Sequence, residues 1–404
     1  MKLVKSLLLG SVAGLAAVAG AQAADLPVAK AAPVEYVRVC STYGSGFFYI
    51  PGTETCLRVG GRVRADYIYV EPDDRTDDAI GFRARGRIQL DARTATAYGL
   101  LRTFVRMELY RDTGAFADTP GGVTARSDLD QAFVQFGGLT AGRAQTFFDN
   151  PDLDSQVFGT VRWSDQPNVN MLAYTFSFGN GFSATLSLEE GRYSGRDFLG
   201  YDFGDGVVED FRVAGQRTPD VVAALTYAGT WGSATVAGAL HQVRGLADPT
   251  VIGADTPDTE YGFAVTAQGT FNVPMLAAGD ALWFAATYAD GAIGYLGFDG
   301  DPEAVYDADG EIDTTKGWSV AAGLRHYWTP ELRQNIFGSY ARVEFGDLFD
   351  VNDFTEWRAG TNLIWSPVSG LDLGVEVLYS NFDPRATGED EDAWQGRLRV
   401  ERNF

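Results

Sequence analysis

The fold is decided by the stretch LRVGGRVRADYIYV, residues 57–70, in which apolar and polar side chains alternate. Successive side chains of a β-strand point to opposite faces, so an extended conformation places Arg58, Arg62 and Arg64 on one face. The other face is apolar. Arginines fit neither a dry core nor a lipid surface, because burying an unpaired charge is costly. The stretch therefore predicts a strand with one face in water and the other in an apolar medium.

The same alternation continues along the chain. The polar face of the next two segments, 82–93 and 100–110, is again rich in arginine: Arg83, Arg85, Arg87, Arg102 and Arg106. Sixteen strands are predicted in all, at 57–70, 82–93, 100–110, 128–137, 139–146, 171–179, 182–190, 219–228, 231–241, 260–271, 281–290, 317–328, 331–345, 355–365, 371–381 and 393–404. An even number of alternating segments of about ten residues is typical of transmembrane barrels. We therefore predict an all-β, 16-stranded antiparallel transmembrane β-barrel.

The gaps between these segments alternate in length. Gaps as short as 137–138 and 180–181 are separated by long, mostly acidic gaps such as 147–170. Short turns on one rim and long loops on the other are typical of outer-membrane barrels. The long gaps hold three acidic clusters, which would be solvated or would bind Ca²⁺ or Mg²⁺ weakly. These clusters lie at 73–78, 307–313 and 389–392.

Residues 1–23 predict a cleaved secretory signal peptide. Two lysines precede an uncharged apolar stretch, residues 6–20, and Ala21-Gln22-Ala23 supplies the small-x-small cleavage pattern. No later stretch reaches the roughly 20 apolar residues that a membrane-spanning helix needs. The predicted organisation is a leader (1–23), an N-terminal periplasmic segment (24–55) and a barrel (56–404).

Cys40 and Cys56 are the only cysteines. In the oxidising cell envelope an even pair favours a disulfide, which would close a short loop just before the first strand. Two free thiols are the alternative.

The composition supports an exported all-β protein and argues against other classes. Glycine supplies 48 of 404 residues and the formal net charge is −22. Such a composition suits a large barrel with polar loops, and an acidic surface does not suit nucleic acid. The only histidines, His241 and His326, lie on a polar face and at a strand end. We therefore expect no metal, no cofactor and no enzymatic activity.

The functional site of a water-filled barrel is its narrowest part and the charges that line it. Arginines from the first three strands should form one basic patch. Arginines from late strands should extend it, because the last strand closes the barrel against the first. The expected inward-facing residues are Arg58, Arg62, Arg64, Arg83, Arg85, Arg87, Arg102, Arg106, Arg342, Arg358, Arg397 and Arg399. Charges of one sign focus an electric field across the lumen. Alternatively, these arginines only hydrogen-bond across strands and stiffen the wall.

The opposing charge is expected from the gap 147–170, which combines acidic with aromatic residues. Its acidic residues are Asp149, Asp152, Asp154 and Asp165. Folding inward would bury the aromatic side chains and present these carboxylates to the arginines, which gives a charge-separated slot. An ordinary solvated loop is the alternative.

Two stretches near the mature N terminus resemble the opening of alphaproteobacterial porins of the rhizobial type. They read PVEYVRVC at 33–40 and GFFYIPGTETCLRVGG at 46–61. The likeness covers the mature chain in layout and is close in the first third and near the end, whereas the long loops do not match. It implies a trimeric, 16-stranded outer-membrane porin, a water-filled channel for passive diffusion of small hydrophilic solutes and ions, with the third loop as constriction.

The resemblance also implies roles for particular residues. Cys40 and Cys56 would form a disulfide at the periplasmic entrance, and the terminal Phe404 resembles the insertion signal read by the barrel-assembly machinery. The expected partners are further copies of the chain in a homotrimer, outer-membrane lipid and lipopolysaccharide, that machinery and small hydrophilic solutes. The constriction would be lined by Asp149, Asp152 and Asp154 on the loop and by Arg62, Arg64, Arg83, Arg85 and Arg102 on the wall.

Three other classes of protein fit the sequence less well. A substrate-specific outer-membrane channel needs an aromatic track along its lumen, and a barrel lipase needs a Ser–His pair. A soluble secreted protein would have to cover both faces of all the strands. Most aromatic residues share the apolar face, as membrane-interface girdles do: Tyr67, Tyr69, Phe82, Trp318, Trp357, Trp365, Tyr379 and Trp394.

Overall fold

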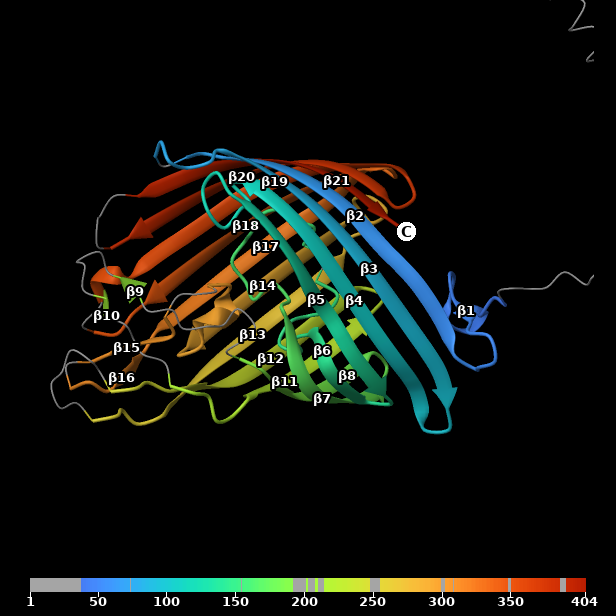
Figure 1. Cartoon of the computed structure of the whole chain (residues 1–404), viewed down its shortest axis with the longest axis horizontal. Coiled ribbons are helices and arrows are strands. Elements are labelled where there is room, and N and C mark those ends of the chain that lie inside the picture. The colour runs from blue at the N-terminus through green and yellow to red at the C-terminus, as the bar shows by residue number, and fades with distance from the viewer. Residues whose placement is uncertain are drawn as a thin grey trace, which may run out of the picture. The chain divides into compact units, whose positions relative to one another are not determined.

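Sixteen antiparallel strands close into a barrel in the computed structural model, which confirms the predicted fold (Figure 1). The strands are β2 (Cys56–Val70), β3 (Ile80–Thr96), β4 (Gly99–Gly114), β5 (Val123–Phe136), β6 (Leu139–Gln145), β7 (Asn168–Gly179), β8 (Phe182–Glu189), β11 (Asp220–Gly229), β12 (Gly232–Val243), β13 (Glu260–Asn272), β14 (Ala281–Asp290), β17 (Lys316–Thr329), β18 (Leu332–Glu344), β19 (Phe354–Val368), β20 (Leu371–Pro384) and β21 (Glu391–Asn403). The barrel closes where β21 pairs with β2, with Asn403 opposite Arg62.

The structure describes residues 38–72, 74–153, 155–191, 201–202, 208–209, 214–247, 255–298, 302–307, 309–347, 350–385 and 390–404. The predicted signal peptide lies outside these residues, as does Asp154. Within them, no helix is long and apolar enough to cross a membrane.

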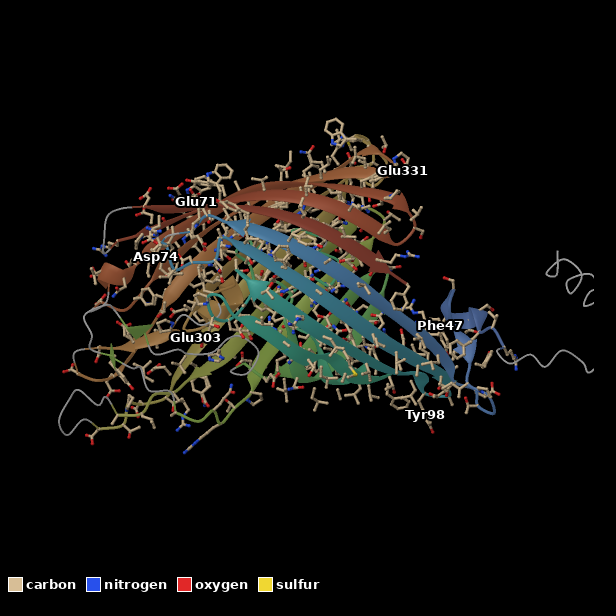
Figure 2. All side chains as sticks on the ribbon, turned by 45° about the horizontal axis from the view of Figure 1, so that its top comes forward. Phe47, Glu71, Asp74, Tyr98, Glu303 and Glu331 are labelled. Atoms are coloured by element: carbon tan, nitrogen blue, oxygen red, sulfur yellow. A yellow bond between two sulfur atoms is a disulfide. The ribbon has the colours of Figure 1, made fainter. Side chains whose placement is uncertain are left out.

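Short turns lie at one end of the barrel and long loops at the other. The end with the short turns also holds the C terminus and β1 (Phe48–Tyr49), as Figure 1 shows. Figure 2 places Tyr98 and Glu331 at that same end and Glu71, Asp74 and Glu303 at the opposite end. Because outer-membrane barrels keep short turns in the periplasm, the first end is periplasmic and the second extracellular.

One short turn shows how the sequence makes this possible. Asn180 and Gly181, between β7 and β8, have φ angles of 51° and 87°. A two-residue hairpin turn of this type needs positive φ at both positions, and asparagine and glycine adopt it most readily.

The outer face of the barrel is apolar and aromatic. Val63, Ile88 and Leu398 are each more than half exposed there, as membrane-facing side chains are in an isolated chain. The expected inward orientation of Arg342 is wrong. Arg342 lies an even number of residues from Ile336 and therefore shares the outer face of β18 with it. Its guanidinium pairs with Glu344, two residues further along this face, at 2.6 Å.

Residues 40–55 are joined to the periplasmic end of β2. The structure contains the Cys40–Cys56 disulfide, so the alternative of two free thiols does not hold. β1 pairs with β2, with Phe48 opposite Leu57. This pairing covers the edge of β2 that β21 leaves uncovered, because β21 pairs with β2 only from Arg62 onward.

Candidate permeation pathway

Arginines of β2, β3 and β4 form a basic wall on the inner face of the barrel. Strand register brings them together: Arg62 lies opposite Arg87, and Arg64 lies opposite Arg85. The same wall continues onto β21, which the closure of the barrel places beside β2. We call this surface the arginine wall; it consists of Arg58, Arg62, Arg64, Arg83, Arg85, Arg87, Arg102, Arg106, Arg397 and Arg399.

Glu108 is the centre of the arginine wall. Its carboxylate is fully buried and contacts three guanidinium groups, those of Arg62, Arg85 and Arg87. It also accepts a hydrogen bond from the Tyr110 hydroxyl. One buried negative charge therefore holds three positive charges in place, because removing it would leave them to repel one another.

Other carboxylates of the wall strands pair with the remaining arginines. Arg83 binds Asp112 through two nitrogen–oxygen contacts of 2.8 and 2.9 Å. Arg399 contacts Asp66 at 2.5 Å. The expectation that the arginines need a loop to supply their opposing charge is wrong, because carboxylates on neighbouring strands supply it. The wall carboxylates are Asp66, Asp91, Glu108, Asp112, Asp130 and Glu401.

Inward-facing aromatic rings accompany these arginines, and the sequence analysis missed them. The guanidinium of Arg83 lies 4.3 Å from the centre of the Phe116 ring, and that of Arg85 lies 4.7 Å from Tyr110. A guanidinium over an aromatic face is an attractive arrangement. Because each ring is in contact with an arginine, these aromatics support the wall.

Residues 147–167, here called the inner loop, contact inward-facing residues on the opposite side of the barrel. The Phe148 ring packs in a cluster with small inward-facing side chains such as Ala237 and Ala264. The backbone N–H of Asn150 donates to Gln268 of β13 at 2.8 Å. Of the aromatic side chains of the loop, Phe148 and Trp163 are buried, and Phe147 and Phe158 are partly buried.

The tip of the inner loop is bound to the late strands. Glu376 of β20 accepts hydrogen bonds from the backbone N–H groups of Phe158 and Gly159, at 2.7 and 2.6 Å. A Cβ atom at Gly159 would lie 2.7 Å from Cδ2 of Leu378, so a larger residue here would require the Leu378 side chain to move. Three residues of this loop that are not glycine adopt positive φ: Gln156, Asp165 and Gln166. Such strained backbone persists where surrounding contacts fix it.

Two of the arginines that were predicted to line the pore donate hydrogen bonds to the backbone of the inner loop. Arg397 donates to the Phe158 carbonyl at 2.6 Å, and Arg358 donates to the Thr160 carbonyl at 3.2 Å. Arg162 of the loop pairs in turn with Glu356. Inward orientation alone could not reveal this role, since it depends on where the loop lies.

The acidic residues of the inner loop occupy different environments. Asp149 is 2% exposed and accepts hydrogen bonds from the Gln166 backbone and the Gln268 amide. We expected Asp149 to line the slot, but its carboxylate instead binds one group of the loop itself and one side chain of β13. Asp152 and Asp165 are exposed.

A second loop enters the barrel, which the sequence analysis expected to be an ordinary outer loop. Tyr295, in the 3-10 helix η2 (Ile293–Leu296), is fully buried, and its ring lies 4.4 Å from Phe148. The Glu303 carboxylate lies 2.9 Å from Nε2 of His241 on β12. The sequence feature that could have indicated this inward path is the apolar content of residues 293–298.

A cavity of about 260 Å³ lies between the loop tip and the part of the arginine wall formed by β2 and β21. Arg64, Arg399 and Glu401 line it on the wall side and Phe158 on the loop side. The Arg399 guanidinium lies 4.2 Å from the centre of the Phe158 ring. The inner loop and the arginine wall thus meet at β21.

The chain belongs to a porin subfamily, whose sequence pattern matches residues 25–401. It is 30% identical to porin Omp2a of Brucella suis biovar 1, over 99% of this chain and all of that one. It is 31% identical to porin Omp2b of the same organism, over 99% of both chains. The resemblance to alphaproteobacterial porins is confirmed.

Solved outer-membrane channels share the fold. The channel DcaP of Acinetobacter baumannii superposes with a TM-score of 0.68 at 19% identity, covering 88% of this chain and 99% of that one. OmpF of Salmonella typhi, in complex with daunomycin, superposes with a TM-score of 0.53 at 13% identity, covering 87% and 98%. The protein is an outer-membrane porin, and the interior described above is its channel.

Proposed function

We propose that small hydrophilic solutes and ions cross passively between the arginine wall and the inner loop. The observation that carries this proposal is the span of the loop, whose backbone binds Gln268 on β13 and Glu376 on β20. These anchors hold the loop across the interior, and the wall of β2 to β4 lines the remaining passage. Diffusion through it requires no reaction, so we propose a channel without enzymatic activity.

Both surfaces of this passage carry charge. The residues proposed to line it are Asp152 and Asp165 on the loop and Arg62, Arg64, Arg83, Arg85, Arg87, Arg102 and Arg106 on the wall. The end of the loop supports this arrangement, because Asn168 donates to Asp130 at 2.8 Å. Asp130 is itself the carboxylate that contacts Arg87 and Arg106. The exposed Asp165, three residues before Asn168, is thereby brought near the wall.

Ion selectivity in a planar lipid bilayer tests the passage. We would replace Arg85 and Arg87 by glutamine and measure the reversal potential in a salt gradient. A unit charge about 5 Å from an ion's path contributes roughly 0.5 kcal/mol in salt solution. Each lost charge acts on anions and cations with opposite sign, so losing two should lower the anion-to-cation permeability ratio about thirtyfold.

Arg342→Gln is the matched control, since it removes a guanidinium from the outer face and should leave the reversal potential unchanged. An unchanged potential in the double variant, with the channel still conducting, would place the passage elsewhere.

We also propose a homotrimer, in which the subunits meet through the early and late strands. Open space surrounds Gly86 of β3 and Gly396 of β21, which face outward and would let a second wall approach closely. Gly60 and Gly61 do not offer such space, because a Cβ at Gly60 would meet Gln89 and one at Gly61 would meet the Phe404 ring. Cross-linking in outer membranes should give a ladder ending at three chains. A ladder that stops at the monomer would refute the trimer.

A further inference from the structure

Three arginines converge on one carboxylate at the periplasmic end of the barrel, away from the inner loop. Asp91 is 1% exposed and receives two nitrogen–oxygen contacts from Arg93, at 3.0 and 2.7 Å. Arg102 makes two more, at 3.0 and 3.1 Å. The third arginine, Arg58, lies 3.9 Å from the same carboxylate.

Among the residues that the structure describes, the charges of this cluster do not balance. Three guanidinium groups share a single carboxylate, and Arg93 and Arg102 occupy both of its oxygens. Arg58 is held more loosely, and 41% of its side chain is exposed. A guanidinium presents planar donors that match the oxygens of a carboxylate or phosphate. An anion at Arg58 would relieve the repulsion among the three arginines.

The disulfide-closed segment fixes an aromatic ring beneath this cluster. The guanidinium carbons of Arg58 and Arg93 lie 5.1 and 5.0 Å from the centre of the Phe47 ring. Phe47 is buried with both disulfide cysteines, and its carbonyl accepts a hydrogen bond from the Cys40 backbone at 2.9 Å. Figure 2 places Phe47 at the end of the barrel that carries Tyr98 and Glu331. The segment therefore supports the guanidinium groups of Arg58 and Arg93 from one side.

We propose that Arg58 and Arg93, supported by Phe47, form a binding site for oxyanions at the periplasmic mouth of the channel. The ligand class is a small phosphate or carboxylate, bound through the exposed donors of Arg58. The site differs from the passage at Glu108, because Arg58 and Arg93 share a different carboxylate and only Arg102 of this cluster also belongs to the proposed lining of the passage. It gives the disulfide segment a role beyond covering the edge of β2.

Titration calorimetry with inorganic pyrophosphate, on the mature protein purified in detergent at low salt, tests the site. Hydrogen bonds to charged groups are worth about 1.5–3 kcal/mol. Arg58→Gln should therefore weaken binding roughly ten- to a hundredfold. Phe47→Leu keeps an apolar side chain but removes the aromatic face, and should weaken binding by a smaller factor. Arg342 is similarly exposed but lies on the outer face, so Arg342→Gln should leave pyrophosphate binding unchanged.

Three results would overturn the proposal. The first is wild-type protein that does not bind pyrophosphate, and the second is an Arg342→Gln variant that binds as weakly as Arg58→Gln. The third is binding that only Arg85→Gln weakens, which would place the anion in the main passage. Calorimetry in detergent does not depend on conduction. A negative result would therefore leave the channel function intact, and conductance measurements on the same samples would show this.

Discussion

Glu376 should decide how firmly the tip of the inner loop is held. Its carboxylate is 3% exposed and accepts hydrogen bonds from Phe158 N, Gly159 N and the Asn362 amide, at 2.7, 2.6 and 2.9 Å. Replacement by alanine removes both bonds to the loop backbone. Bonds to a charged group are worth about 1.5–3 kcal/mol each, so the docked tip should lose roughly 3–6 kcal/mol.

That loss has a measurable consequence for the channel. Since about 1.4 kcal/mol is a factor of ten in an equilibrium constant, detachment of the tip should become at least a hundredfold more frequent. Single-channel recordings in planar bilayers should then show added current noise and brief steps to higher conductance. Arg162, bound to Glu356, remains as an anchor, so the loop should not leave the wall altogether.

Two controls make this result interpretable. Glu331→Gln changes an exposed glutamate in a periplasmic turn and should leave the recordings unchanged. Heat-modifiable migration in detergent gels shows whether the Glu376→Ala barrel folds, and Glu376→Gln is the milder substitute if it does not. A correctly folded Glu376→Ala channel with wild-type noise and conductance would refute the role of this carboxylate, and would assign the fixed position of the tip to Arg162.

Three further predictions follow from the buried groups and the N terminus. Glu108→Gln removes the carboxylate shared by three arginines and should destabilise the barrel by about 3–5 kcal/mol while raising anion selectivity, measured by denaturant unfolding and reversal potential. Replacing Cys40 and Cys56 by serine should cost the N-terminal segment about 3 kcal/mol of local stability, so that limited proteolysis cuts between these residues while the barrel stays folded. The mature protein should begin at Ala24; N-terminal sequencing that finds a distant start would contradict the signal-peptide assignment.

The strands could be predicted because their signal is local. Alternation with a period of two is visible within a single segment such as 57–70, and a closed barrel makes every segment repeat it. The same alternation accounts for Arg342, which lies an even number of residues from the outward-facing Ile336 and therefore faces outward as well.

The site was harder to predict because its contacts join distant parts of the chain. Alternation places Glu108 inward, but its pairing with Arg62 depends on the register between three strands. The inner loop is anchored by Gln268 and Glu376, which are 118 and 218 residues from the backbone groups they bind. Nothing in the loop's own sequence identifies either partner.

Different residues hold the arginine wall and the inner loop in place, so substitutions can alter the charge and the width of the channel separately. Most arginines of the wall are fixed by carboxylates on their own strands, chiefly Glu108 and Asp91, and the loop tip is fixed by Glu376 on β20 and by Arg397 on the adjoining β21. Charge at the passage is therefore set mainly by one group of residues and its width by another. Loosening the loop through Glu376 should change conductance more than ion selectivity. Altering Glu108 should change selectivity more than conductance, because the loop anchors on β13 and β20 remain in place.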